Sequence, residues 1–187
     1  MADRSAKSNK STEGKAMKYY PISLFALAAI VASPAEAAWQ FQIQEDPMTD
    51  AKRGISLLLG DAGGLAIKCD ENGPGSLYIS FISTEFLGST SGRDGRLVRY
   101  RIDKGEPSDM VIKYNDSTAS IFDLSPGSEG GNFLNNLLES RELVVQLTSY
   151  RYETYTILFD TTGIEEAVAK SAQVCGDTEW LSPPPSS

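Results

Sequence analysis

Two cysteines, Cys69 and Cys175, are the residues with the clearest chemical potential in this chain of 187 residues. The chain contains no histidine, which excludes Ser-His-Asp and Cys-His catalysis as well as histidine metal sites. The two cysteines are far apart in the sequence and no CxxC spacing occurs, which disfavours a redox-active or metal-binding pair of thiols. We therefore expect one structural disulfide, which requires an oxidising compartment.

Acidic residues gather in two short segments, with Asp46 and Asp50 in EDPMTD and with Asp70 and Glu71 after the first cysteine. Neither segment has the spacing of a calcium loop, so we expect solvated turns, with no metal and no cofactor. Two carboxylates brought together from distant positions could still hydrolyse a glycan, and this alternative stays open. GSTSG resembles a nucleophile elbow, but its centre is Thr90 rather than serine, and we expect a flexible turn there.

Four arginines fall within nine positions of an otherwise acidic chain: Arg93, Arg96, Arg99 and Arg101. Arginines on an exposed strand could contact an acidic protein partner, and these four are our candidates for such a contact. The alternative is an ordinary solvent-exposed strand face.

The beginning of the chain predicts export. Lys18 is followed by the apolar run ISLFALAAIVA, which is too short to cross a bilayer, where about 20 residues are needed. Pro34 ends the run, and Ala35 and Ala37 are the small residues at positions minus three and minus one that a signal peptidase accepts. This pattern favours a cleaved leader over its alternative, an uncleaved membrane anchor.

We predict that residues 1–37 are a signal peptide and that the protein is periplasmic. The polar stretch before Met17 favours that methionine as the true start. Removing residues 1–37 removes five basic and three acidic residues, which leaves 12 Lys and Arg against 22 Asp and Glu, a net charge of −10. An acidic surface repels phosphate backbones and anionic lipids, so we expect no nucleic-acid partner and no binding to a membrane surface. Because cleavage removes the apolar run, we also expect no membrane span after signal cleavage.

The elements that must position these residues are mostly strands. Nine short segments are rich in β-branched or aromatic residues and are bounded by turn residues. They are WQFQI, GISLLLG, LAIKC, SLYISFI, RLVRYRID, DMVIKY, TASIF, ELVVQLTSY and ETYTILFD. In RLVRYRID, Leu97, Arg99 and Arg101 alternate with Val98, Tyr100 and Ile102. One face of this strand is therefore apolar and the other mostly charged, and the turn DKGEP predicts a hairpin to the next strand.

Two helices interrupt or follow the strands. NFLNNLLES has apolar residues at helical spacing and could begin with an Asn132 cap. In the last helix, Thr162 and Glu165 have the spacing of a capping box, and Gly176 is a natural C-cap. Its apolar or small residues form one stripe that ends on the second cysteine: Ile164, Ala167, Val168, Ser171 and Cys175.

We therefore predict a mainly β (α+β) fold, an antiparallel β-sandwich or curled sheet with one mid-chain helix and a C-terminal helix tied by the Cys69–Cys175 disulfide. Residues 38–176 would form a single exported domain. Residues 177–187 would form a loose tail, because they are rich in proline and serine.

An ordered set of short segments follows the predicted mature start. It comprises DPMTDAK, the strand ending in Cys69, YIS with FLG, VRYRIDKGEP, the helix around FLNNLLES, LVVQLTSY, and FDTTGIEEAV followed by Cys175 and Gly176. This set resembles the VasI/TagO-like family of exported proteins associated with bacterial type VI secretion gene clusters. The chain departs from the family pattern between Met110 and Tyr114, which lacks a tryptophan, and in its C-terminal extension.

The resemblance implies a periplasmic accessory role and brings no established catalytic residues. We therefore expect a non-catalytic accessory or interaction protein of a bacterial cell-envelope machine, most concretely type VI secretion, with a protein partner in the envelope. Two alternatives stay open. One is a carboxylate-dependent cell-wall hydrolase, for which peptidoglycan would be the ligand, and the other is a prophage-derived periplasmic inhibitor that acts by protein binding.

Overall fold

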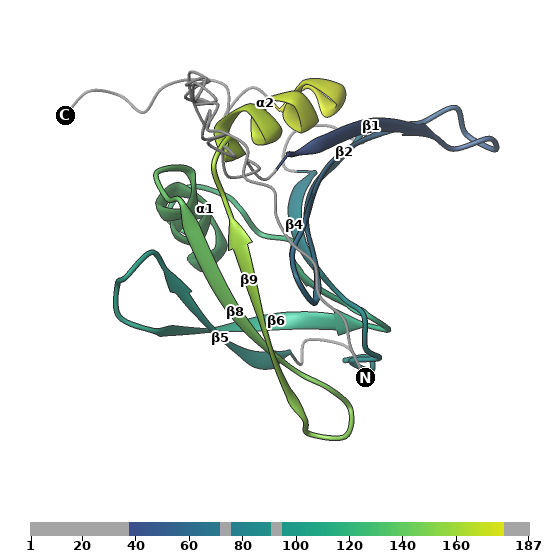
Figure 1. Cartoon of the computed structure of the whole chain (residues 1–187). Coiled ribbons are helices and arrows are strands. Elements are labelled where there is room, and N and C mark those ends of the chain that lie inside the picture. The colour runs from purple at the N-terminus through teal and green to yellow at the C-terminus, as the bar shows by residue number, and fades with distance from the viewer. Residues whose placement is uncertain (1–37, 72–75, 91–94, 178–187) are drawn as a thin grey trace, which may run out of the picture. The chain divides into compact units, whose positions relative to one another are not determined.

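The computed structural model describes residues 38–71, 76–90 and 95–177. These residues form nine strands and two helices (Figure 1). The strands are β1 (Gln40–Glu45), β2 (Lys52–Leu59), β3 (Gly63–Asp70), β4 (Leu77–Ser83), β5 (Arg96–Ile102), β6 (Ser108–Asn115), β7 (Thr118–Ile121), β8 (Glu142–Thr148) and β9 (Thr154–Asp160). The helices are α1 (Glu129–Leu138) and α2 (Ile164–Cys175). The predicted signal peptide, Arg93 and nearly all of the predicted tail lie outside the described residues.

The nine described strands form one antiparallel sheet in the order β1-β2-β3-β4-β7-β6-β5-β8-β9. Strand β6 joins the two halves, because its first part pairs with β5 up to Ile112 and its last part pairs with β7 from Lys113 onward. The sheet is therefore curled. The predicted mainly β fold with two helices is confirmed, and each of the nine predicted segments contains a strand.

The curl brings the β2–β3 turn against the last strand, β9. The N–H of Leu158 lies 3.5 Å from Oδ1 of Asp61, and Gly60 packs so closely that a Cβ there would lie 2.8 Å from the Leu158 carbonyl oxygen. One edge of the sheet is thus covered by a turn, whereas β1 forms the other edge.

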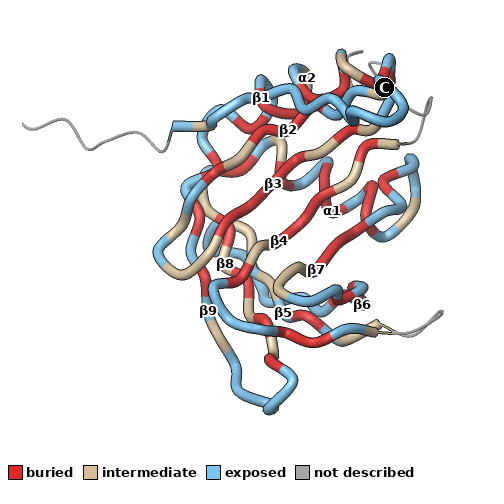
Figure 2. The backbone as a smooth tube through the Cα atoms, turned by 90° about the vertical axis from the view of Figure 1, so that its right-hand side faces the viewer, coloured by how far each residue is buried: buried red, intermediate tan, exposed pale blue. Residues whose placement is uncertain are grey.

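In β5, β6 and β9, buried or half-buried residues of the inner face alternate with exposed residues of the outer face, whereas β3 and β4 have no exposed residue on either face (Figure 2). Both helices pack on the inner face. Helix α1 inserts Phe133, whose ring lies 4.9 Å from that of Tyr100 and 6.3 Å from that of Phe81. No helix within the three described ranges is long and apolar enough to span a membrane.

Helix α1 begins four residues earlier than predicted. The predicted Asn132 cap is wrong, because Ser128 is the N-cap and its Oγ accepts the Gly131 N–H at 2.9 Å. Glycines are poor helix formers, so Gly130 and Gly131 gave no helical signal. Both are buried with their Cα atoms close to the backbone of the preceding loop, where a Cβ would collide with the carbonyl oxygens of Asp123 and Ser125.

Helix α2 has the predicted buried stripe and the predicted Gly176 C-cap, at φ +69°. The predicted capping box is wrong. Gly163 occupies the N-cap position at φ +84°, and no side chain caps the helix. Thr162 lies one residue outside, where its N–H donates to Asp160 Oδ1 at 3.1 Å and its carbonyl accepts from Trp39 Nε1 at 3.1 Å. The chain enters α2 through a glycine turn that also holds the start of the sheet.

The predicted disulfide between Cys69 and Cys175 is present, with the Cα atoms 5.7 Å apart. It joins the end of β3 to the end of α2 across 106 positions of the chain. Asp177, the first residue of the predicted loose tail, is buried, and its N–H donates to the Ala172 carbonyl at 3.0 Å. The described chain is therefore held firmly up to its last residue.

We expect Cys69→Ser and Cys175→Ser to lower the free energy of unfolding equally, by about 4 to 5 kcal/mol in the chain-entropy model for a loop of this length. The double variant should be no worse than either single variant, because both remove the same bond. Urea unfolding followed by circular dichroism measures this. Clearly unequal single variants would show that each cysteine contributes mainly through its own packing.

Candidate functional site

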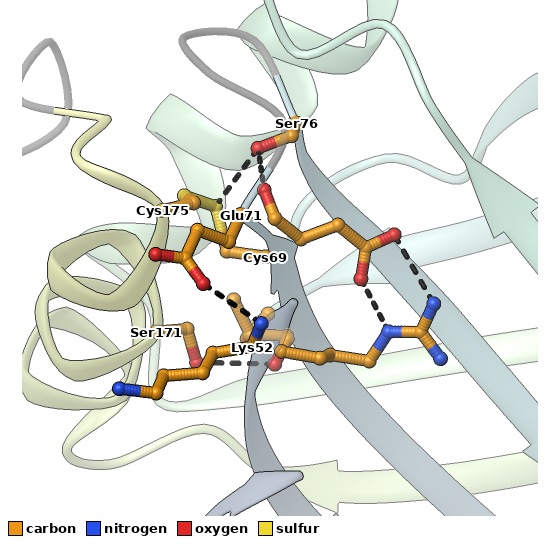
Figure 3. A network of polar contacts seen from close by, with 9 residues as sticks. Lys52, Cys69, Glu71, Ser76, Ser171 and Cys175 are labelled. Atoms are coloured by element: carbon orange, nitrogen blue, oxygen red, sulfur yellow. Dashed lines mark hydrogen bonds and ion pairs between the residues drawn. A yellow bond between two sulfur atoms is a disulfide. The ribbon is translucent and has the colours of Figure 1, made fainter. Parts of the chain in front are cut away.

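Buried serines fasten α2 to the sheet beside the disulfide (Figure 3). Ser56 Oγ donates to the Ala167 carbonyl at 2.8 Å, and Ser171 Oγ lies 3.1 Å from the Ile67 carbonyl oxygen and 3.0 Å from Ser56 Oγ. Both hydroxyls are thus used in joining helix to strand. This cluster is structural, since its polar groups satisfy one another inside the core.

The acidic residues around the first cysteine are engaged by neighbouring basic residues or backbone. Asp70 forms an ion pair with Arg53, and its hydrogen bond is the main reason why the pKa of Arg53 is raised. Glu71 Oε2 accepts the backbone N–H of Lys52 at 2.8 Å (Figure 3), and Asp46 Oδ1 accepts the Met48 N–H at 2.7 Å. These carboxylates fix turns and strand ends.

Asp46 and Asp70 nevertheless line one cavity of about 360 Å³ at the base of the β1–β2 hairpin, together with Lys52 and Arg53. In the described ranges, no three His, Cys, Asp or Glu side chains come close enough together to hold a metal ion. The cavity is therefore lined by both acidic and basic side chains. Two of them, Arg53 and Asp70, already form an ion pair with each other. Asp50 lies in the turn beyond it, at φ +57°.

Half-buried groups continue this charged region on the outer face. Burial lowers the pKa of Lys68, and the nearby Arg53 guanidinium adds to the effect. The Lys68 ammonium lies 5.9 Å from the centre of the Tyr78 ring, and burial raises the pKa of that phenol. Tyr78 in turn stacks on Phe122 at 5.3 Å. These contacts cover the middle of the sheet.

The predicted arginine patch is divided between the two faces of β5. Arg99 and Arg101 lie exposed on the outer face, as the alternation predicted. Arg96 points to the inner side, where its Nη1 lies 2.9 Å from the Leu87 carbonyl oxygen and 3.2 Å from that of Thr148. Arg93 lies outside the described residues, so two of the four candidates stand on the outer face.

Arg96 holds several segments together. Its guanidinium also lies 5.1 Å from the centre of the Tyr114 ring and 3.2 Å from the Ser149 carbonyl oxygen. Arg96 has the same strand parity as Val98, so the alternation of RLVRYRID already contained the signal that it faces inward.

The outer side of the β5–β6 hairpin combines apolar and charged groups. Leu97 and Val111 are paired across the two strands, and each is 61% exposed. Beside them Arg99 forms a two-point ion pair with Asp109, at 2.8 and 3.1 Å, which lowers the pKa of that carboxyl group. Arg101 makes no hydrogen bond or ion pair with any described residue. We name these five residues the β5–β6 outer face.

A small hollow of about 190 Å³ adjoins this face. It is lined by Arg99 and Arg101 with Tyr100, Pro107, Val144 and Gln146. Guanidinium groups present several N–H donors in a planar fork that suits a carboxylate, so this hollow can bind an acidic group.

An exposed aromatic cluster was missed in the sequence. The rings of Phe86 and Tyr150 meet edge to face at 5.2 Å, and the guanidinium of Arg151 lies 5.3 Å from the centre of the Tyr150 ring. Tyr152, in the same β8–β9 turn, is 88% exposed at φ +65°, a conformation that bulky residues rarely adopt. The tyrosines of SYRYE, at the junction of two predicted strands, were the available signal, but the sequence did not show that Phe86 lies beside them.

The segment around Thr90 is better ordered than the predicted flexible turn. The Thr90 N–H donates to the Tyr114 carbonyl at 2.9 Å, and the Tyr114 N–H donates to Thr90 Oγ1 at 3.0 Å. These bonds hold Thr90 beside the last part of β6.

We expect Arg96→Ala to lower the free energy of unfolding by about 2 kcal/mol, because it leaves partly buried carbonyl oxygens without a donor. Arg101→Ala should leave the urea midpoint nearly unchanged, since that side chain is exposed and unpaired among the described residues. Urea titration of both variants measures the difference. Equal midpoints would contradict the structural role assigned to Arg96.

Comparisons with family models, with curated proteins and with solved structures found no match to this chain. The resemblance to the VasI/TagO-like family is therefore still a prediction from the short segments in the sequence.

Proposed function

We propose that this protein is an exported, periplasmic and non-catalytic interaction module of a bacterial cell-envelope machine, most concretely type VI secretion. The observation that carries the proposal is the Cys69–Cys175 disulfide. Disulfides of this structural kind persist in oxidising compartments, and the leader-like residues 1–37 supply a route to one. The assignment to type VI secretion comes from the family resemblance in the sequence.

The β5–β6 outer face is the surface that we propose contacts the partner. It joins an exposed apolar pair, Leu97 and Val111, to two arginines. Protein interfaces are enriched in arginine and combine an apolar centre with a polar rim, which this arrangement provides. Arg101 is unpaired among the described residues, so it is free to meet a carboxylate of the partner. An acidic segment of an envelope protein fits this chemistry.

Export has a specific expected product. The protein isolated from the periplasm should begin at Ala38, because Ala35 and Ala37 satisfy signal peptidase. N-terminal sequencing of the mature protein checks this, and Ala37→Arg should block processing and leave a longer chain in the membrane fraction. A chain that keeps residues 1–37 and stays in the cytoplasm would contradict the proposed location.

Partner binding can be tested by crosslinking the tagged protein in its host and identifying captured proteins by mass spectrometry. We expect capture of secretion-system membrane or baseplate subunits, and we expect Arg99→Ala with Arg101→Ala to reduce it several-fold. The matched control is Lys52→Ala with Arg141→Ala, which removes the same charge from exposed residues elsewhere.

Equal loss of capture in both double variants would contradict a specific contact at the β5–β6 outer face. Release of soluble fragments from purified peptidoglycan by the wild-type protein would overturn the non-catalytic assignment. Unchanged secretion after deletion of the gene would count against the type VI assignment while leaving export intact.

A further inference from the structure

Strand β1 ends the sheet with an open edge. It pairs with β2 on one side only, and all six of its residues are exposed. The opposite edge, β9, is covered in part by the β2–β3 turn through Asp61 and Gly60. Proteins usually protect such an edge with lysine, proline or a bulge, because unpaired N–H and C=O groups invite another strand. The sequence QFQIQE of β1 contains none of these residues and has one charge, Glu45, at its end.

The free backbone groups of β1 can be assigned from the hairpin that follows it. The Asp46 N–H donates to the Ala51 carbonyl at 2.9 Å, so the backbone of Asp46 points toward β2. Backbone direction alternates along a strand, so Gln44 and Gln42 also point toward β2. Phe41 and Ile43 then present their N–H and C=O groups to the open side.

The order of residues in β1 is complementary to itself. In an antiparallel pair of two copies centred on Gln42, Phe41 lies opposite Ile43 of the second copy, and Gln40 lies opposite Gln44. Phe41 and Ile43 are the residues with free backbone groups, so each such pair can exchange both hydrogen bonds. Glu45, the one charged residue, lies opposite Trp39, and no like charges meet.

The side chains in this arrangement also match. Phe41 lies opposite Ser56 in the β1–β2 register, so it points to the inner side, where it lines a cavity of about 270 Å³ with Trp39 and α2. Phe41 is 39% exposed and Ile43 is 56% exposed. Pairing would place Ile43 of the second copy beside Phe41 and cover both. Glutamines would meet glutamines on the outer side, where amides can bond to one another.

We propose that β1 is the surface through which two copies of this chain associate, by antiparallel β1–β1 pairing about a two-fold axis at Gln42. The two nine-stranded sheets then form one continuous sheet. This interface does not depend on the proposed function, because it uses a different strand from the β5–β6 outer face.

The first test is sedimentation velocity on the purified protein. The protein is expressed from the full-length gene and purified in the form that the cell produces. The interface is small, so we expect a concentration-dependent monomer–dimer equilibrium at concentrations of about 1 to 100 μM. Gln42→Lys and Gln42→Glu should each shift the equilibrium toward monomer at low salt, because like charges then face each other across the axis. A mixture of the two variants should regain the dimer.

Cysteine crosslinking tests the register. In the proposed dimer, Gln42 of one copy lies opposite Gln42 of the other, as a pair that exchanges no backbone hydrogen bonds. The Cα atoms of such a pair are about 4.5 Å apart, which suits a disulfide. Gln42→Cys should therefore form a covalent dimer on oxidation. Gln40→Cys alone should not, whereas a mixture of Gln40→Cys and Gln44→Cys should. Peptide mapping confirms that Cys69–Cys175 stays intact, and circular dichroism confirms that each variant is folded.

A monomer over the whole concentration range would overturn the proposal, and so would a dimer that both charge variants leave unchanged. Equal crosslinking by Gln40→Cys and Gln42→Cys would overturn the register. Capture of an envelope partner by a protein that sediments as a monomer would support the proposed function and reject the dimer. A dimer that captures no partner would support the β1 interface and count against the proposed function.

Discussion

The attachment of α2 to the inner face of the sheet is the constraint on which the rest of the structure depends. A curled antiparallel sheet has an apolar concave side that must be covered, and α2 covers the part formed by β1, β2 and β3. The Cys69–Cys175 disulfide holds the last turn of the helix, while Ser56 and Ser171 bond the middle. Gly54 permits the close approach, since a Cβ there would lie 3.0 Å from the Ser171 carbonyl oxygen.

The other half of the sheet is organised by a different device. Strand β6 pairs with β7 and with β5 in succession, so the sheet turns where β6 changes its neighbour. Arg96 holds this corner through carbonyl oxygens of two distant segments and through the Tyr114 ring. The Arg96 guanidinium thus fixes the positions of both segments relative to β6. The arginine is therefore used for the scaffold, and the outer face is left to Arg99 and Arg101.

The inner side of the sheet is filled by side chains. Apart from the serine bridges and Arg96, the inner side is packed with apolar residues and two helices, so the outer face and the edges are the surfaces open to a partner. The β5–β6 outer face and the β1 edge are well separated in the strand order, with four strands between β1 and β6. Self-association through one can therefore coexist with partner binding through the other. The disulfide is compatible with the export that we propose.

The sequence by itself determined the nine strands, the buried stripe of α2 and the pairing of its two cysteines, because alternation, helical spacing and cysteine count are local properties. It misplaced the caps of α1 and α2. Gly130 and Gly131 are poor helix formers that fit only because they pack closely on the preceding loop, and Gly163 lies beside Trp39, which is distant in the chain. Tertiary structure alone decided which partners satisfy Arg96 and which edge of the sheet stays open. Those outcomes depend on the curl at β6, where segments far apart in sequence meet, and no local pattern encodes that meeting.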